Sequence, residues 1–418
     1  MKIIFPLTFV CLTLFLVFSF SLTVVADESD FVPLLAPQPG ISWVENSKPL
    51  NGWVKRGGEA TFMVEGDSIV GKRGTGINTF LCSEKRYSNF ILKFEVKYDA
   101  ECNSGVQFRS DLQSKDGQEI LAGYQCEILP ENDTANIYDE HRRNRYLVPQ
   151  TEELQTKINQ AFKKNNWNEI VVQCVGPSIK TWLNGEKITD IVDLETNEGI
   201  LGLQVHSGEQ GQVRWRNIQI KELPPTPWIL LYADKKLGNV ETKPVGKWDI
   251  QEDGSLKGTT EQGQPKDGMF LSRESYKDFA VKVSFKMITG NSGLYFRAEE
   301  VDKPYWLKGF QCEIATGGAM GANAGLWEVQ GRGWVAKRDD FVKKIYKTEE
   351  WNHIGTVAIG DHLTTFLNGW TVIDINDPKC AKEGKTGLQL HGGGNQGCLF
   401  RDYYIMPLDE NAVELIKK

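Results

Sequence analysis

Short runs of alternating apolar and polar residues cover most of the chain. In FILKFEVKY (90–98), every second residue from Phe90 is apolar, and Lys93, Glu95 and Lys97 lie between them. This period of two is typical of a strand with one buried and one solvated face. The Asn-Gly pairs at 184–185 and 368–369 favour tight hairpins between such runs. Helical periodicity is weak and confined to 151–163 and to the tail after Leu408. The pattern predicts an all-β chain of two-sheet, jelly-roll β-sandwiches.

Several landmarks occur twice in the same order, at offsets of about 184 to 189 residues. They are YSNFILKFEV and YKDFAVKVSF, NSGVQFR and NSGLYFR, GYQCEI and GFQCEI, WLNG and FLNG, and GLQVHSG and GLQLHGG. One domain has therefore been duplicated whole. We place the first copy at 27–223, a proline-rich linker at 224–227, the second copy at 228–408 and a tail at 409–418, because the prolines of the linker do not fit inside a sheet.

The N-terminal residues have the pattern of a targeting signal. An apolar run from Ile3 to about Val25 ends in small or short residues, which predicts a secretory signal peptide over 1–26. An uncleaved membrane anchor is the alternative, because the run approaches spanning length. After cleavage we expect a periplasmic or secreted protein without a membrane segment.

Charge and cysteine content exclude some functions. The net charge is −7 with Lys and Arg scattered, which argues against nucleic acid as a partner. Seven of the eight cysteines remain once Cys11 is removed, and none stands in a CxxC pair, which argues against a structural zinc site. Pairing of Cys82 with Cys102, or of Cys380 with Cys398, stays open.

Strand alternation predicts a row of polar groups on one sheet face. Cys126 points to the core, whereas Gln125 and Glu127 face outward as an exposed pair. By the same rule Gln107 with Arg109, and Gln204 with His206, face outward. If the strands are neighbours, Arg109, Glu127 and His206 converge and supply an anchor, a base and a proton carrier. Arg297, Glu313 and His391 form the same set in the second copy. The alternative is an ordinary solvated face with a cross-strand Arg–Glu pair.

A charged segment, YDEHRRNR (138–145), follows and has the composition of a loop. The second copy reads LWEVQGRGW (326–334), with Val329 in place of Glu140. Trp327 and Trp334 are candidates to stack on a sugar ring, or they are core residues.

These motifs, with NTFLCSEKRYSNF (78–90) and WRNIQIKEL (215–223), resemble the 3-keto-disaccharide hydrolase domain family over about 50–223 and, more loosely, 228–408. The resemblance implies two concanavalin A-like sandwiches that act on an oligosaccharide or glycoside oxidised at carbon 3. A ketone there acidifies the hydrogen on carbon 2, so one base can start an elimination at carbon 1, and water then adds back. No Glu-x-Asp-x-Glu strand of the kind found in glucanases occurs, which argues against paired-carboxylate hydrolysis.

Carried over residue by residue, the resemblance implies a catalytic set in the first copy, namely Glu127, Arg109, His206, Glu140 and Asp139. For substrate binding the resemblance adds Tyr138, Arg142 and Arg145. The outward rows and the charged segments of the two copies supply the other candidates, namely Gln107, Gln125, Arg297, Gln311, Glu313, Trp327, Glu328 and His391. One divalent cation held by Glu127, His206 and Glu140 is an open option. The main hypothesis is a glycoside-cleaving enzyme with an active first copy. The alternative is a non-catalytic, lectin-like protein, and no feature of the sequence favours a scaffold role.

Overall fold

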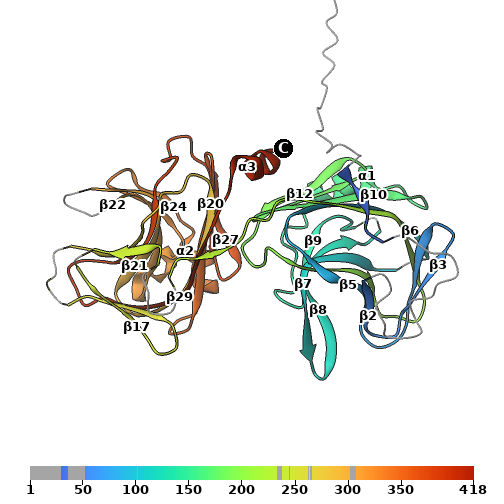
Figure 1. Cartoon of the computed structure of the whole chain (residues 1–418), viewed down its shortest axis with the longest axis horizontal. Coiled ribbons are helices and arrows are strands. Elements are labelled where there is room, and N and C mark those ends of the chain that lie inside the picture. Colours follow the sequence, from blue (N-terminus) through green and yellow to red (C-terminus); the bar gives the residue numbers. More distant parts are fainter. Residues whose placement is uncertain are drawn as a thin grey trace, which may run out of the picture.

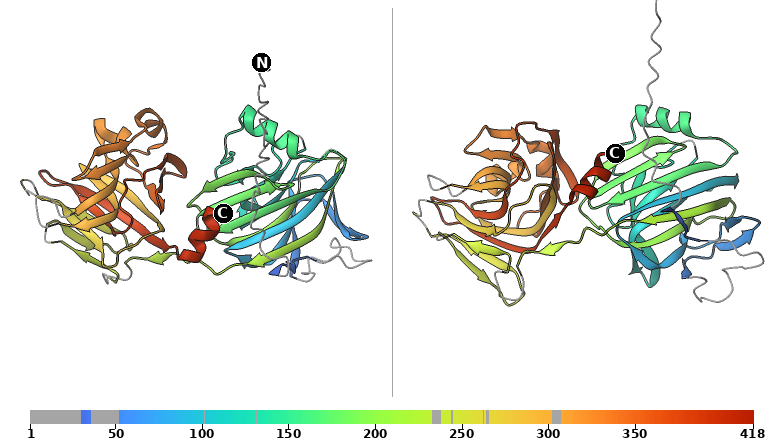
Figure 2. Two further views of the ribbon diagram at one scale, coloured as in Figure 1. Left: turned by 90° about the horizontal axis from the view of Figure 1, so that it is seen from above. Right: turned by 45° about the horizontal axis from the view of Figure 1, so that its top comes forward.

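The computed structural model describes residues 30–35, 52–100, 102–130, 132–232, 238–243, 245–261, 263, 266–301 and 307–418. The predicted signal peptide lies outside these residues. Figures 1 and 2 show two lobes side by side, with the C-terminal helix between them. Within the described residues each lobe consists of two antiparallel sheets, so the prediction of an all-β chain with two tandem sandwiches is confirmed.

The first sandwich is built from β1 to β14. One sheet has the order β12-β11-β10-β6-β14-β4-β3, with β1 also paired to β14. Its strands are β12 (Glu186–Val192), β11 (Ser178–Leu183), β10 (Asn168–Val175), β6 (Phe90–Ala100), β14 (Gln212–Glu222), β4 (Ser68–Lys72), β3 (Thr61–Glu65) and β1 (Val32–Pro33). The facing sheet consists of β2 (Trp53–Gly57), β5 (Thr79–Tyr87), β13 (Gly199–Val205), β7 (Ser104–Lys115), β8 (Gln118–Ile128) and β9 (Ile137–Glu140), in that order.

The second sandwich repeats this plan. One sheet has the order β17 (Lys247–Ile250), β18 (Leu256–Thr259), β29 (Gly397–Pro407), β20 (Phe279–Thr289), β25 (Asn352–Ile359), β26 (His362–Leu367) and β27 (Trp370–Asn376), with β15 (Ile229–Leu230) also on β29. The facing sheet has the order β16 (Val240–Thr242), β19 (Gly268–Ser272), β28 (Lys385–Leu390), β21 (Asn291–Glu300), β22 (Leu307–Ala315), β23 (Leu326–Val329) and β24 (Gly333–Ala336).

Alternation decides what lies between the sheets. Phe90, Leu92, Phe94 and Val96 on β6 are all buried in the first core, whereas Lys93, Glu95 and Lys97 are only partly buried. The two Asn-Gly pairs form hairpin turns with positive φ at both residues, as the sequence predicts. All seven cysteines that the structure describes are buried and unpaired, so neither pairing left open by the sequence is formed.

Helices are short and few in the described parts of the chain. Two arise where weak periodicity predicts them, α1 (Glu152–Ala161) and α3 (Glu410–Lys417), and α2 (Asp339–Ile345) and the 3₁₀ helix η2 (Gly317–Ala322) do not. An apolar cluster between the lobes contains Val175 of the first, Phe366 of the second and Val413 of α3. Burial of such apolar surface stabilises the contact between the sandwiches. No described helix is long and apolar enough to cross a membrane.

Candidate functional site

A chain of buried polar groups lies on the outer face of the β2-to-β9 sheet, the face opposite the core. Gln107 on β7 pairs with Gln125 on β8. The Gln107 amide donates to Gln125 Oε1 over 3.4 Å, and Gln125 Nε2 donates to Glu127 Oε1 over 2.6 Å. Gln125 and Glu127 are only 2% and 4% exposed, so the prediction of an exposed pair is wrong. Each side chain fixes the orientation of the next along this row.

Gly105 provides the space that this arrangement needs. It lies directly opposite Glu127 in the strand register. A Cβ at this position would lie 2.5 Å from the Cδ atom of Gln125, which is closer than any side chain tolerates. The NSG motif that occurs in both copies therefore keeps the Gln-Glu row in place.

Burial changes the acidity of Glu127. Loss of hydration raises its pKa to about 8, with smaller contributions from Glu140 and Asp133, and the hydrogen bond from Gln125 opposes the rise. The carboxyl group is therefore largely protonated near neutral pH and becomes a base in mildly alkaline solution. Such a shift is typical of a proton-transfer group.

A second glutamine on this face lacks partners. Gln204 on β13 lies opposite Gly105 and is fully buried. Within the described residues neither its amide nitrogen nor its oxygen has a hydrogen-bond partner, and Gln107 Oε1 also has none. Unsatisfied buried amides are costly and rare in folded proteins, so these three atoms mark a position where a polar ligand is expected.

The strand β9 carries two further groups to the same face. Tyr138 lies beside Gln125, and Glu140 lies beside Gly123. Burial raises the pKa of Glu140, and a 3.3 Å hydrogen bond from Asn78 opposes the rise. The Tyr138 ring meets Tyr146 edge-on at 5.1 Å between centroids. A second carboxyl group with a raised pKa and an aromatic pair thus flank Glu127.

His206 lies at the end of β13, next to this face. It is partly buried, and its Nδ1 atom lies 3.0 Å from the Ser207 carbonyl oxygen. The Ser207 amide donates to Asn78 Oδ1, which ties this turn to the partner of Glu140. No group of three His, Cys, Asp or Glu side chains in the described residues is arranged to hold a metal ion, so Glu127, His206 and Glu140 do not form one.

The second sandwich has the corresponding site, lining a cavity of about 320 Å³ that includes Glu313, Gln311, His391, Trp327 and Trp334. Glu313 accepts from Asn291 and, at 2.9 Å, from Gln311. Burial raises its pKa to about 7, opposed by Asn291 and by His391. Its carboxyl group is therefore less basic than that of Glu127.

The glutamine on β28 is fully used in this copy. Gln389, the counterpart of Gln204, donates to Asp267 over 2.6 Å and to the Tyr295 hydroxyl over 3.2 Å, and accepts from Gln311 over 3.1 Å. Asp267 is the counterpart of Asn78. Each accepts a hydrogen bond from the backbone amide of the residue that follows the histidine at the strand end, Ser207 in the first copy and Gly392 in the second. The side-chain amide of Gln389 is therefore hydrogen-bonded within the protein, whereas that of Gln204 has no partner among the described residues.

Comparison with known proteins identifies the repeated unit. The family model of the 3-keto-alpha-glucoside-1,2-lyase-like domain matches residues 42–221 and again 228–406. The chain belongs to this family. The resemblance predicted from the sequence motifs is therefore confirmed, with two lyase-like domains in tandem.

Solved structures resemble one lyase-like domain at a time. A candidate glycosyl hydrolase of Parabacteroides distasonis has 23% identity and a TM-score of 0.31, over 43% of this chain and 92% of its own. The carbohydrate-binding module CBM66 of Bacillus subtilis has 20% identity and a TM-score of 0.31, over 40% and 95%. No curated protein sequence matches the chain.

The predicted placement of Arg109 and Arg297 on the outer face of their lyase-like domains is wrong. Both have positive φ, 48° and 46°, beside an irregularity in the register of β7 or β21 that breaks the alternation. Arg109 donates to the carbonyl oxygens of Ser88 and Gly176, and Arg297 to those of Lys277 and Gly360. Each arginine thus ties a connection between the two sheets to a turn of the opposite sheet.

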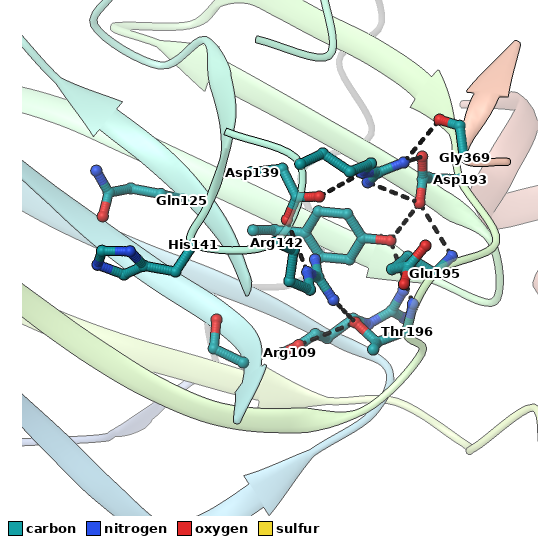
Figure 3. Close-up of polar contacts among 12 residues, drawn as sticks. Arg109, Gln125, Asp139, His141, Arg142, Asp193, Glu195, Thr196 and Gly369 are labelled. Carbon is teal, nitrogen blue, oxygen red and sulfur yellow. Dashed lines mark hydrogen bonds and ion pairs between the residues drawn. The ribbon is translucent and has the colours of Figure 1, made fainter. Parts of the chain in front are cut away.

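Asp139 and Arg142 also lie away from the outer face. Asp139 lies opposite Tyr124, whose ring stacks on Phe108 in the core. It accepts from Arg142 over 2.7 Å and from Arg143, and the Arg142 guanidinium lies 4.4 Å from the Tyr124 ring. Figure 3 shows this cluster with Asp193, and shows Gln125 and His141 apart from it. Alternation within YDE separates Tyr138 and Glu140 from Asp139.

Two other predicted binding residues lie elsewhere. Arg145 contacts the second lyase-like domain, at the Gly369 carbonyl and the Trp370 ring. Glu328, the counterpart of Asp139, pairs with Arg332, which also binds Asp377. Neither side chain joins Gln125 and Glu127 or their counterparts.

The structure adds groups that the sequence-based site omits. Asn78 and Asp267 directly precede their strands. Asn78 opens the motif NTFLCSEKRYSNF, but strand alternation gives no sign that either residue reaches the site. Gln204 and Gln389 could have been included, because alternation in GLQVH and GLQLH already places them outward.

Proposed function

We propose that the first lyase-like domain cleaves 3-keto-glucosides by elimination followed by hydration. The observation that carries the proposal is Glu127, a carboxyl group that is 4% exposed, has a pKa of about 8 and is oriented by Gln125 next to unsatisfied amides. Membership of a family named for a 3-keto-glucoside lyase supports the substrate class.

The proposed reaction needs one base and one acid. Glu127 as carboxylate removes the hydrogen on carbon 2, and the electron pair delocalises onto the carbon 3 ketone as an enolate. When the carbonyl re-forms, a double bond joins carbons 1 and 2 and the bond from carbon 1 to the aglycone oxygen breaks. Glu140 gives a proton to that oxygen. Water then adds across the double bond, with its oxygen on carbon 1 and a hydrogen on carbon 2, which makes the net reaction hydrolysis.

The unsatisfied amides suit the charge that develops. The free Gln204 nitrogen can donate to the enolate oxygen, a task that Arg109 cannot perform from its position between the sheets. The free oxygens of Gln204 and Gln107 can accept from sugar hydroxyls. Preorganised donors in a site that excludes water lower the energy of the transition state most effectively.

The test compares a 3-keto-glucoside with its unoxidised parent in deuterated water. We expect aglycone release from the keto sugar alone, with solvent deuterium at carbon 2 of the product. Release of aglycone from neither sugar would reject an enzymatic function, and release without deuterium would reject elimination in favour of direct displacement.

For the second domain the structure favours sugar binding without cleavage. Val329 replaces the acid Glu140, and the Trp327 and Trp334 rings meet edge-on at 5.1 Å, one of them 39% exposed, so they offer an apolar face to a sugar. Calorimetric titration of a Glu127→Gln protein, in which turnover is blocked, with the keto sugar should show a binding event that Trp334→Ala weakens. No heat at saturating sugar would exclude this role.

The cellular location is proposed from the N-terminal apolar run alone. We expect export from the cytoplasm with cleavage near residue 26. N-terminal sequencing of the protein recovered from the periplasm or the medium would test this, and an intact Met1 would contradict it.

A further inference from the structure

The hairpin that carries Tyr138 and Glu140 is held from its far side by the second domain. Arg143 and Arg145 follow β9 directly and both donate to the Gly369 carbonyl oxygen, over 3.0 and 2.6 Å. The Arg145 guanidinium lies 3.5 Å from the centre of the Trp370 ring. Stacking of this kind adds an electrostatic attraction to the hydrogen bond.

The hairpin is held together by its own backbone hydrogen bonds, so a displacement of Arg143 or Arg145 also displaces Tyr138 and Glu140. The Asp139 amide donates to the Arg145 carbonyl over 3.0 Å, and the Leu147 amide donates to the Ile137 carbonyl over 2.9 Å. Tyr138 also forms an isolated bridge with Tyr146. Arg145 and Glu140 therefore belong to one hydrogen-bonded unit.

The turn that receives the arginines is rigid and shaped for close approach. Asn368 donates to the Ile345 carbonyl over 2.7 Å, and the Trp370 ring meets Phe341 edge-on at 5.7 Å. A Cβ at Gly369 would lie 3.1 Å from Arg143 Cδ, so a larger residue would crowd the contact. This turn joins β26 to β27 and is anchored on α2.

Among the described residues, the contact between the hairpin of one domain and the Asn-Gly turn of the other is found only once. In the first domain the equivalent turn has Gly185, and a Cβ there would meet nothing within 4 Å. In the second domain the counterpart of Arg143 is Arg332, which binds Glu328 and Asp377 of its own domain. Duplication alone does not explain the bond to Gly369, because it has no symmetric equivalent.

Other contacts fix the second domain in this position. Lys180 and Gln173 of the first domain donate to the carbonyl oxygens of Ile416 and Leu415 on α3, over 2.6 and 3.0 Å. Lys282 of the second domain donates to the Leu194 carbonyl over 2.9 Å, next to Asp193, which binds Arg143. The turn at Gly369 is thus part of a continuous interface.

We propose that the second lyase-like domain positions the acid of the first site, through Trp370 and Gly369 acting on the β9 hairpin. Trp370 and Arg145 are positioning residues in this scheme, and Glu140 is the group that they position. The inference rests on the proposed function, because it concerns the same reaction.

The experiment uses the full chain and the variant Trp370→Ala, in which an exposed ring is lost. We expect kcat to fall about tenfold with KM nearly unchanged, because misplacing a catalytic group lowers the rate more than binding. The loss should be larger for a poor leaving group than for a nitrophenol, which needs no acid. Trp370→Phe, which keeps an aromatic face, should restore most of the rate, and Trp370→Ala should add no loss to a Glu140→Val protein.

The matched control is Trp167→Ala, which removes a similar stack, Arg216 at 4.1 Å from the ring, elsewhere on the first domain. It should leave the rate unchanged. Hydrogen exchange gives a readout independent of activity, because amides 139 and 147 should exchange faster in Trp370→Ala than in wild type. Unchanged exchange at these amides, or an equal rate loss with both leaving groups, would overturn the inference. An inactive wild type would reject the proposed function instead, and the exchange result would still decide whether the hairpin is held.

Discussion

The two lyase-like domains share one plan but differ in how their buried carboxyl groups are surrounded. Glu127 is joined by Glu140 and by glutamines with free hydrogen-bonding atoms. Near Glu313, Val329 stands in place of the second acid, and Gln389 is fully hydrogen-bonded. The same strand motif thus lies beside a glutamine with unused polar atoms in one copy and beside a fully hydrogen-bonded glutamine in the other. In the proposed mechanism, the residues around the repeated Gln-Cys-Glu motif, such as Glu140 and Gln204, decide whether its carboxyl group takes part in catalysis.

The largest change is expected from making the first site resemble the second. Glu140→Val removes the proposed acid, and loss of one general acid lowers rates by about 10²- to 10⁴-fold. We expect a loss of that order for an alkyl glycoside and a much smaller loss for a nitrophenyl glycoside, measured by aglycone release. Equal losses for the two substrates would show that Glu140 does not protonate the leaving group.

The pH dependence of kcat/KM should follow the ionisation of the proposed base, Glu127. Because burial raises the pKa of Glu127 to about 8, kcat/KM should fall about tenfold for each pH unit below that value. The fall is expected because the protonated carboxyl group cannot accept the hydrogen from carbon 2. A pH profile with a flat region between pH 5 and 7 would contradict this assignment.

A smaller effect is expected for sugar binding in the second domain. Trp334→Ala removes an exposed aromatic face, and such a contact contributes about 1 kcal/mol, or about a fivefold change in affinity. Calorimetry on the Glu127→Gln background measures this binding without turnover in the first domain. Trp53→Ala is not a suitable control because Trp53 is in the core. The control is the half-buried Trp351, which directly precedes β25 and stacks with Arg401. Equal effects at both tryptophans would argue against a specific platform.

The buried carboxyl groups should also affect stability. A raised pKa in the folded state stabilises the protein below the unfolded value near 4.5, and this contribution is lost as pH rises toward about 8 for Glu127 and about 7 for Glu313. Each group should lower the free energy of unfolding by up to about 1.4 kcal/mol per pH unit in that window. Denaturant titrations at several pH values give the free energy of unfolding as a function of pH. This free energy should fall less steeply with rising pH in Glu127→Gln than in wild type, and an unchanged pH dependence would contradict a buried, protonated Glu127.

Alternation predicted much of the fold and part of the site. It placed Gln107, Gln125 and Glu127 on one face because β7 and β8 are regular there. It failed at Arg109 and Arg297, where a positive φ changes the direction of the side chain. One residue out of step suffices to reverse a prediction based on a period of two.

Contacts between residues far apart in the chain could not be predicted from the sequence for a different reason. Arg145 was predicted to bind substrate, yet its partner is Trp370, 225 positions away by residue number and in the other domain. Nothing in the local pattern distinguishes an arginine that binds sugar from one that binds a neighbouring turn. The residues Asn78 and Asp267 illustrate the same limit, because their role depends on which loops the sheets bring together.

The central claim is that only the first domain catalyses, with Glu127 as base. The most direct test measures aglycone release from a 3-keto-glucoside by Glu127→Gln and Glu313→Gln beside wild type. We predict a loss of about 10²- to 10⁴-fold for Glu127→Gln, the range for losing a general base, and near-normal rates for Glu313→Gln. A fully active Glu127→Gln protein with an inactive Glu313→Gln protein would contradict the claim.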